Sequence, residues 1–185
     1  TIELTLDGFL HIVDPSALEY SVSGHVVGEI VVGGLGKVNE LRHLDLTGKI
    51  VLVKRGDISF KEKMLNASAK GAAGVIYFNN APGTIMGSLG EANNSFLPAV
   101  LLTQAEGEKL VKQVHNNPNT QASLTIEGAN STTNTSHNVI ATKKPSNLNS
   151  KTKAKHDIIV IGAHHDSVAN APGANDNASG TAMTL

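Results

Sequence analysis

Residues 49–78, with the sequence KIVLVKRGDISFKEKMLNASAKGAAGVIYF, decide the fold of the larger part of the chain. Two short apolar runs, at residues 50–53 and 74–78, are rich in β-branched and aromatic side chains and predict buried strands. Between them, Ser59 and Glu62 have the spacing of a capping box, in which the two side chains bind amide groups of a helix's first turn. The stretch therefore predicts a strand, a helix and a second strand.

Similar patterns occur on both sides of this stretch. The alternation of apolar and polar residues from Ile2 to Leu6 predicts a half-buried strand. Thr103 and Glu106 form a second capping-box pair, which predicts a helix that continues to about His115. Further strands are predicted at residues 9–13, 25–32, 98–102 and 121–127.

The composition excludes several classes of partner. The formal net charge is −1, aromatic residues make up 3% of the chain and tryptophan is absent, so neither a basic face nor a stacking platform for nucleic acid is expected. The sequence has no apolar run of about 18 residues, and we expect no membrane-spanning segment. Cysteine is absent, which excludes disulfides and thiolate metal sites.

Two short motifs are better explained as loops than as binding sites. Gly33, Gly34 and Gly36 follow a predicted strand, but the spacing of a dinucleotide-binding or phosphate-binding loop is missing. Residues 55–57 form the tripeptide Arg-Gly-Asp, which can bind integrins. Here the tripeptide joins a strand to a helix, and we expect it to be a structural turn.

The first part of the chain resembles a protease-associated (PA) domain. The resemblance is carried by LTGKIVLVKRG at residues 46–56, SFKEK at 59–63, ASAKGAAGVIYFNN at 67–80 and Pro98-Ala99-Val100. It implies a strand-rich α+β fold over residues 1–128, a β barrel or sandwich with two helices. Domains of this family carry no catalytic residues, and their implied role is to govern substrate access or to bind partners.

A second motif lies near the end of the chain, where an apolar run at residues 158–161 predicts a strand. The run continues into GAHHDS at residues 162–167, and PGANDNASG follows at 172–180. Imidazole and carboxylate groups are ligands that zinc takes in hydrolytic sites, and a carboxylate often orients the metal-binding imidazole. Taken singly, however, His-x-Asp is common, and the Asn-rich segment equally fits a surface turn or a helix N-cap.

Together the two halves of this motif resemble the secreted, bacterial-type aminopeptidases that use two co-catalytic zinc ions. The resemblance implies that His164 ligates one zinc ion and that Asp176 bridges both. It assigns Asp166 as the catalytic acid behind His164. It also implies a strained peptide bond between Asp176 and Asn177, with a cis bond as the expected form.

These resemblances predict three parts of the chain. Residues 1–128 are expected to form the PA domain, residues 129–136 a polar linker, and residues 137–185 the first part of an α/β zinc-peptidase domain. The first two strands of that domain are expected at 137–142 and 157–162. The general base and the remaining zinc ligands are expected downstream of Leu185, so this chain alone is expected to be inactive.

The function implied for the full-length protein is zinc-dependent hydrolysis of N-terminal residues from peptides by a metal-bound hydroxide. Its expected partner is a peptide or protein substrate, without nucleic acid or membrane, and its expected location is extracellular. The alternative is a non-catalytic PA module on a receptor-like scaffold that binds proteins or peptides. Such relatives usually lose their metal ligands, whereas His164 and Asp176 are both present here.

Overall fold

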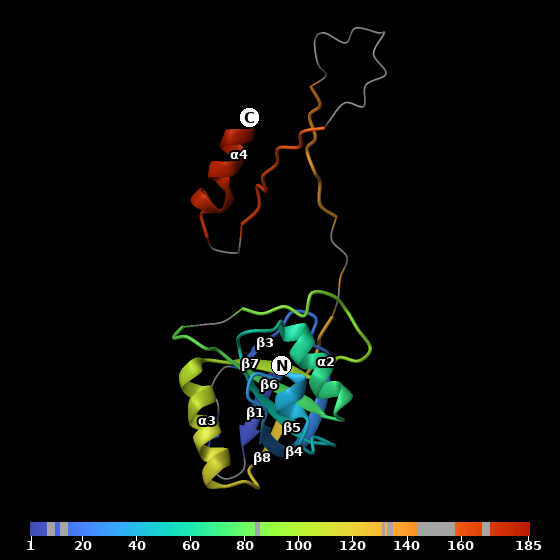
Figure 1. Cartoon of the computed structure of the whole chain (residues 1–185), viewed down its shortest axis with the longest axis vertical. Helices are drawn as coiled ribbons and strands as arrows, with labels where there is room; N and C mark the ends of the chain where they lie inside the picture. Colours follow the sequence, from blue (N-terminus) through green and yellow to red (C-terminus); the bar gives the residue numbers. More distant parts are fainter. Residues whose placement is uncertain are drawn as a thin grey trace. The chain divides into compact units, whose positions relative to one another are not determined.

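The computed structural model describes residues 1–6, 10–11, 15–83, 86–130, 132, 135–143, 158–167 and 171–185 (Figure 1). The chain divides into two compact units, Thr1–Thr135 and Ser136–Leu185. No helix in the described part of the chain has the length and apolar character that crossing a membrane requires. Residues 9, 12 and 13 of a predicted strand, and residues 131, 133 and 134 of the predicted linker, lie outside the described residues.

The described residues of the first unit form one eight-stranded sheet with the order β2-β1-β8-β4-β5-β6-β7-β3. The strands from β4 to β7 run parallel to their neighbours within that group, and the other pairings are antiparallel. The strands are β1 (Ile2–Leu6), β2 (Leu10–His11), β3 (Ser16–Ala17), β4 (Gly24–Val32), β5 (Ile50–Lys54), β6 (Gly74–Phe78), β7 (Ala99–Leu102) and β8 (Gln121–Ile126). The strand-rich α+β fold predicted for this region is confirmed.

Strand β4 belongs to both halves of the sheet. Residues 24–29 pair antiparallel with β8, and residues 30–32 pair parallel with β5. At Gly28, near the change of partner, a Cβ atom would lie 2.8 Å from the Gly48 carbonyl oxygen, so only glycine fits. The antiparallel and parallel halves are therefore joined through the backbone of one strand.

Both predicted helices begin at the residues that the capping patterns indicate. Helix α2 (Phe60–Ala69) begins after Ser59, whose side chain accepts a hydrogen bond from the Glu62 amide. Helix α3 (Gln104–Asn116) begins with the complete reciprocal box of Thr103 and Glu106. A four-residue helix, α1 (Val38–Leu41), precedes β5.

The central parallel strands are buried on both faces, with α2 and α3 on opposite sides of the sheet (Figure 1). Successive side chains of β5, β6 and β7 point to opposite faces and enter two separate cores. Leu110 and Val114 of α3 belong to one core, and Met64 and Ala67 of α2 belong to the other. This double burial explains why these strands are apolar at nearly every position.

Gly107 lets α3 lie directly on the sheet, and its replacement tests how tight that contact is. A Cβ atom at Gly107 would lie 2.2 Å from the Cβ of Phe78. Gly107→Ala gains about 1 kcal/mol of helix propensity, but overpacking a core costs about 1–3 kcal/mol. Because contacts as short as 2.2 Å place this cost in the upper half of the range, about 2–3 kcal/mol, we expect a net loss of about 1–2 kcal/mol in the free energy of unfolding, measured by urea denaturation. The exposed Lys109→Ala is the control, and an unchanged or higher stability for Gly107→Ala would contradict the prediction.

The second unit contains the short helix α4 (Ser179–Thr184), preceded by the turn η1 (Ala174–Ala178), in which Asp176 and Asn177 have non-helical backbone angles. Two strands were predicted at 137–142 and 157–162. In the described part of the chain, residues 135–143 and 158–167 make no β-ladder, so these strands are not formed there. A strand is maintained by hydrogen bonds to a neighbouring strand, and the described residues supply none here. All four side chains of residues 158–161 are accordingly at least 76% exposed. Residue 157 lies outside the described residues.

Candidate metal centre

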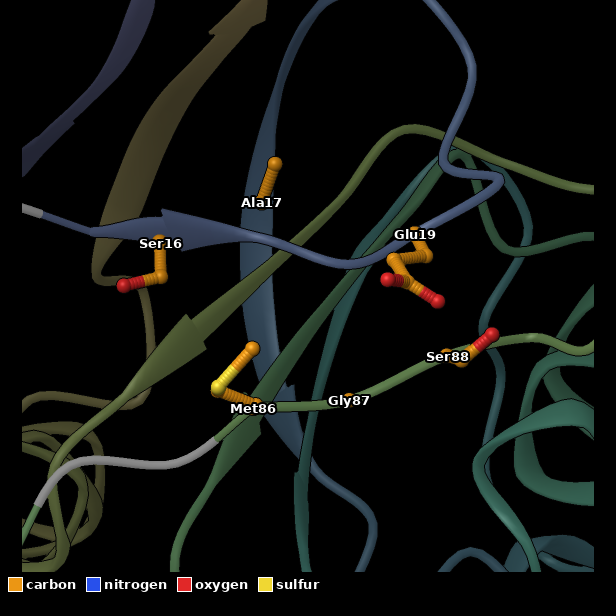
Figure 2. A pocket seen from close by; sticks show the side chains of 6 residues that line it. All are labelled: Ser16, Ala17, Glu19, Met86, Gly87 and Ser88. Atoms are coloured by element: carbon orange, nitrogen blue, oxygen red, sulfur yellow. The ribbon is translucent and has the colours of Figure 1, made fainter. Parts of the chain in front are cut away.

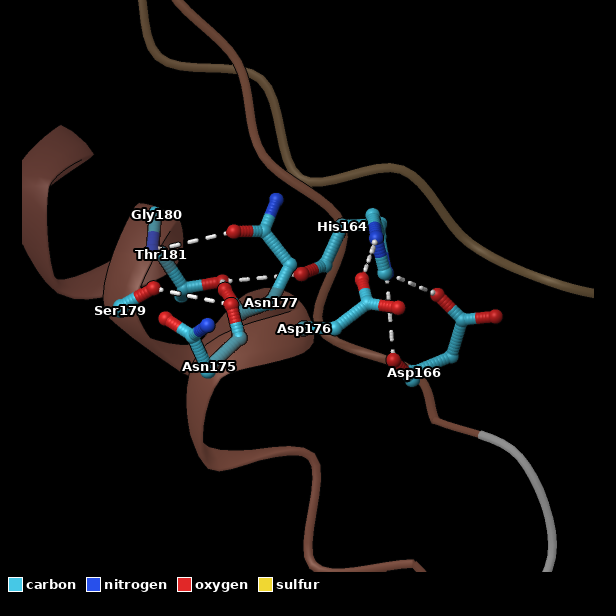
Figure 3. A network of polar contacts seen from close by, with 8 residues as sticks. All are labelled: His164, Asp166, Asn175, Asp176, Asn177, Ser179, Gly180 and Thr181. Carbon is cyan, nitrogen blue, oxygen red and sulfur yellow. Dashed lines mark hydrogen bonds and ion pairs between the residues drawn. The ribbon is translucent and has the colours of Figure 1, made fainter.

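The candidate site is formed by two segments of the second unit, residues 164–167 and 173–181 (Figure 3). Gly173 has a φ of +64°, a left-handed conformation that favours glycine. A Cβ atom at this position would lie 2.9 Å from the Cβ of Ser167. The absence of a side chain at Gly173 therefore allows the turn that carries Asp176 to lie close to the segment that carries His164.

The three predicted site residues lie together. The Nε2 atom of His164 is 2.9 Å from Oδ1 of Asp176. On the other side of the ring, Nδ1 is 3.1 Å from Oδ1 of Asp166 and 3.1 Å from its carbonyl oxygen. Each ring nitrogen thus faces a different carboxylate, as Figure 3 shows. The roles of these residues toward a metal stay predictions.

These contacts raise the pKa of His164 above its usual value. The hydrogen bond to the Asp166 carbonyl raises this pKa most. The Asp166 side chain raises it less, and the charge of Asp176 raises it least. A ring protonated at both nitrogens donates to both partners, so the surroundings favour the imidazolium. A metal ion at Nε2 would replace one of these two protons.

The donor atoms fit zinc in type and in spacing. Two donors bound to one tetrahedral zinc ion at about 2.1 Å lie about 3.4 Å apart. The observed 2.9 Å between His164 Nε2 and Asp176 Oδ1 is only slightly shorter. Asp166 takes the position behind Nδ1 that orients a metal-binding imidazole. In the described part of the chain, no three His, Asp or Glu side chains converge on a common metal position, so two donors are available at this site.

Residues next to Asp176 stabilise its turn, and the sequence analysis did not identify them. The Asn177 Oδ1 atom accepts a hydrogen bond from the Gly180 amide at 3.1 Å. A Cβ atom at Gly180 would lie 2.2 Å from that oxygen, which explains the glycine. Ser179 donates to the Asn175 carbonyl at 3.0 Å. The peptide bond between Asp176 and Asn177 is cis, which confirms the form that the family resemblance implied.

The first unit also carries two hollows that could hold a ligand. One, of about 400 Å³, lies between β3 and residues 86–88 (Figure 2). Its lining contains a single titratable side chain, Glu19, and therefore offers no acid–base pair.

The other hollow, of about 380 Å³, lies between α3 and the loop after β4, and we call it the α3 groove. Its lining includes the last residues of three parallel strands, Val32, Lys54 and Phe78. Ligands of parallel sheets commonly bind at this edge. The apolar floor of the groove has charged groups at its rim, where Lys54 Nζ lies 3.6 Å from Glu108 Oε1. The complete lining is Val32, Gly34, Leu35, Glu40, Lys54, Phe78, Glu108, Val111 and Lys112.

Comparison with protein-family models gives two adjacent matches. Residues 16–110 match the PA domain, and residues 138–185 match peptidase family M28. The chain belongs to the PA domain family. The PA match lies within the first unit, and the M28 match lies within the second.

Relatives of this PA-domain chain are aminopeptidases. It is 39% identical to aminopeptidase YwaD of Bacillus subtilis over 143 residues. The matched region covers 76% of this chain and 28% of YwaD. It is 33% identical over 186 residues to the probable leucine aminopeptidase 2 of Aspergillus fumigatus, covering 98% of this chain and 35% of that protein. The chain therefore spans about a third of the length of these curated relatives.

Solved structures agree with this assignment. The aminopeptidase from Aneurinibacillus sp. strain AM-1 matches with a TM-score of 0.84 and 43% identity, over 100% of this chain and 43% of that chain. A structure of BSAP, a zinc aminopeptidase from Bacillus subtilis, matches with a TM-score of 0.60 and 27% identity, over 99% of this chain and 45% of that one. The peptidase interpretation is thus favoured over a non-catalytic module.

The contacts of His164 predict how its titration responds to substitution. Asp166→Asn and Asp176→Asn each remove a negative charge that favours the imidazolium, so both lower the pKa of His164. A pH titration of the ring C–H resonances by NMR measures both effects. Ser167→Ala, which removes no charge, is the control, and equal titration in all four proteins would contradict the geometry.

Proposed function

We propose that the full-length protein is an extracellular zinc aminopeptidase that removes N-terminal residues from peptides, and that this chain supplies its PA domain and part of its metal centre. The observation that carries the proposal is the arrangement around His164, with Asp176 Oδ1 2.9 Å from Nε2 and Asp166 Oδ1 3.1 Å from Nδ1. The M28 match and the aminopeptidase relatives support it. The extracellular location follows from the family resemblance.

In this proposal, the described residues bind zinc and orient the His164 ring. Bound zinc would supply Lewis-acid chemistry and a hydroxide nucleophile at neutral pH. Asp166 accepts the Nδ1–H hydrogen bond, which places the lone pair of the neutral ring on Nε2, facing Asp176. Asp176 would hold zinc through the Oδ1 atom that faces His164, and its second oxygen would be available to a second zinc ion.

Zinc titration of this chain tests the metal assignment. His164→Ala removes the imidazole donor, and Asp176→Ala removes the carboxylate donor. We therefore expect calorimetry to show saturable zinc binding by the unsubstituted chain and none by either variant. Asp166→Asn keeps both donors but weakens the orientation of His164, and we expect an affinity loss of about 10–100-fold.

His165→Ala is the matched control for this titration, because it removes an adjacent imidazole that the proposal does not use. If His165→Ala loses zinc and His164→Ala retains it, the assignment is wrong. In the full-length protein, release of N-terminal residues from peptides should stop in a strong zinc chelator and return when zinc is restored.

The α3 groove supports a second role, which is peptide contact by the PA domain. Its floor is apolar, and both signs of charge occur on its rim. The Glu40 carboxylate already accepts hydrogen bonds from two loop amides, those of Leu35 and Lys37, which fix its position. Lys112, on α3, contributes a positive charge. An apolar side chain flanked by the charged ends of a short peptide matches this surface, and we propose that the groove binds such peptides.

Tri-leucine is a suitable probe for the groove. Val111→Glu places a carboxylate on the apolar floor, where burying a leucine side chain against it is unfavourable, so we expect affinity to fall at least about tenfold. Lys112→Glu, at an exposed position, reverses one rim charge without changing the floor and should also weaken binding. Lys109→Glu makes the same charge reversal on α3 outside the groove lining. Equal binding by Val111→Glu, Lys109→Glu and the unsubstituted chain would rule out this role.

A further inference from the structure

Thr181 links helix α4 to the backbone of His164. Its Oγ1 atom donates toward the His164 carbonyl oxygen at 3.0 Å, across 17 residues of sequence (Figure 3). The same oxygen lies 3.1 Å from the carbonyl of Asn177, four residues earlier in the chain. The hydroxyl thus connects the segment that carries His164 with the turn that carries Asp176.

Few other interactions hold these two segments together. In the described residues, the segment 158–167 makes no β-ladder, so the backbone at His164 lacks the hydrogen bonds that a strand would provide. The contact between the His164 ring and Asp176 joins side chains, and Gly173 packs against Ser167. Among the described residues, the hydrogen bond from Thr181 is the one that acts on the backbone of His164 itself.

The position of Thr181 depends on the residue that follows Asp176. Asn177, the next residue after Asp176, accepts the Gly180 amide through its side chain and so holds the start of α4. Thr181 follows Gly180 directly and lies on the first turn of this helix. The donor that holds the His164 carbonyl and the turn that carries Asp176 are therefore parts of one local structure.

We propose that Thr181 is a positioning residue that maintains the separation of the two metal donors, His164 Nε2 and Asp176 Oδ1. This inference rests on the proposed zinc site. Holding the His164 carbonyl restricts the backbone from which the imidazole projects, and a preformed donor pair binds zinc more tightly than one that must first be ordered. The competing explanation is a helical threonine that bonds only to the carbonyl four residues earlier, a common local interaction without effect on a metal.

Three variants of the 185-residue chain separate these explanations. Thr181→Val keeps the shape of the side chain but removes the O–H donor, and Thr181→Ser keeps the donor. Thr184→Val is the matched control, because Thr184 lies on the same helix and donates to the Thr181 carbonyl rather than to His164. Zinc is titrated into each protein, and the ring C–H resonance of His164 is followed by NMR, so that binding through this residue is observed directly.

We expect Thr181→Val to raise the dissociation constant for zinc at His164 by about 3–10-fold, the usual effect of losing one hydrogen bond. Thr181→Ser and Thr184→Val should stay within about twofold of the unsubstituted chain. The His164 resonance of zinc-free Thr181→Val should also shift, whereas it should not in Thr184→Val.

Two results would overturn the inference while the zinc site stands. In the first, Thr181→Val binds zinc like the unsubstituted chain while His164→Ala does not bind. In the second, Thr181→Ser loses as much affinity as Thr181→Val, which would assign the effect to side-chain shape. If zinc fails to shift the His164 resonance in the unsubstituted chain, the proposed metal site is wrong and the role of Thr181 is rejected with it.

Discussion

The PA domain depends on the double pairing of β4. Six residues of this strand pair antiparallel with β8, and the following three pair parallel with β5. Parallel neighbours must be connected by crossovers, and α2 and α3 cover opposite faces of the parallel strands. The antiparallel half, with β1 and β8, adds its apolar side chains to the core on the α3 side. Near the change of partner, a Cβ atom at Gly28 would lie 2.8 Å from the Gly48 carbonyl oxygen, which explains the lack of a side chain there.

A buried lysine organises the loops at the edge of this sheet. Lys63 of α2 is fully buried, and burial lowers its pKa. Its ammonium group donates to the carbonyl oxygens of Leu35 and Gly56. These two loops are the glycine-rich segment after β4 and the Arg-Gly-Asp turn after β5, so one side chain stabilises both. Asp57 of the tripeptide pairs with Lys37 at 2.5 Å, which supports the structural role expected for this turn.

The candidate metal centre has many contacts among its own residues but few donors for a metal. His164, Asp166 and Asp176 contact one another within two short segments, and glycines at 173 and 180 permit the close approaches that this requires. The described residues bring two donors to one metal position, while the curated relatives are about three times as long as this chain. The arrangement is consistent with a local unit of a larger site, in which Asp166 contacts the ring of His164 and Thr181 contacts its backbone carbonyl.

Features that depend on neighbouring residues were predictable from the sequence alone. Periodicity located β5, β6 and β7, and capping side chains located the starts of α2 and α3. The two-part motif pointed to His164, Asp166 and Asp176, which lie together in the structure. Tertiary structure decided the features that depend on distant residues. The change of partner along β4 and the burial of Lys63 both require elements far apart in the chain, and neither leaves a local pattern. The segments at 137–142 and 158–161 were predicted as strands but do not form them in the described residues, because a strand exists only when another strand supplies its hydrogen bonds.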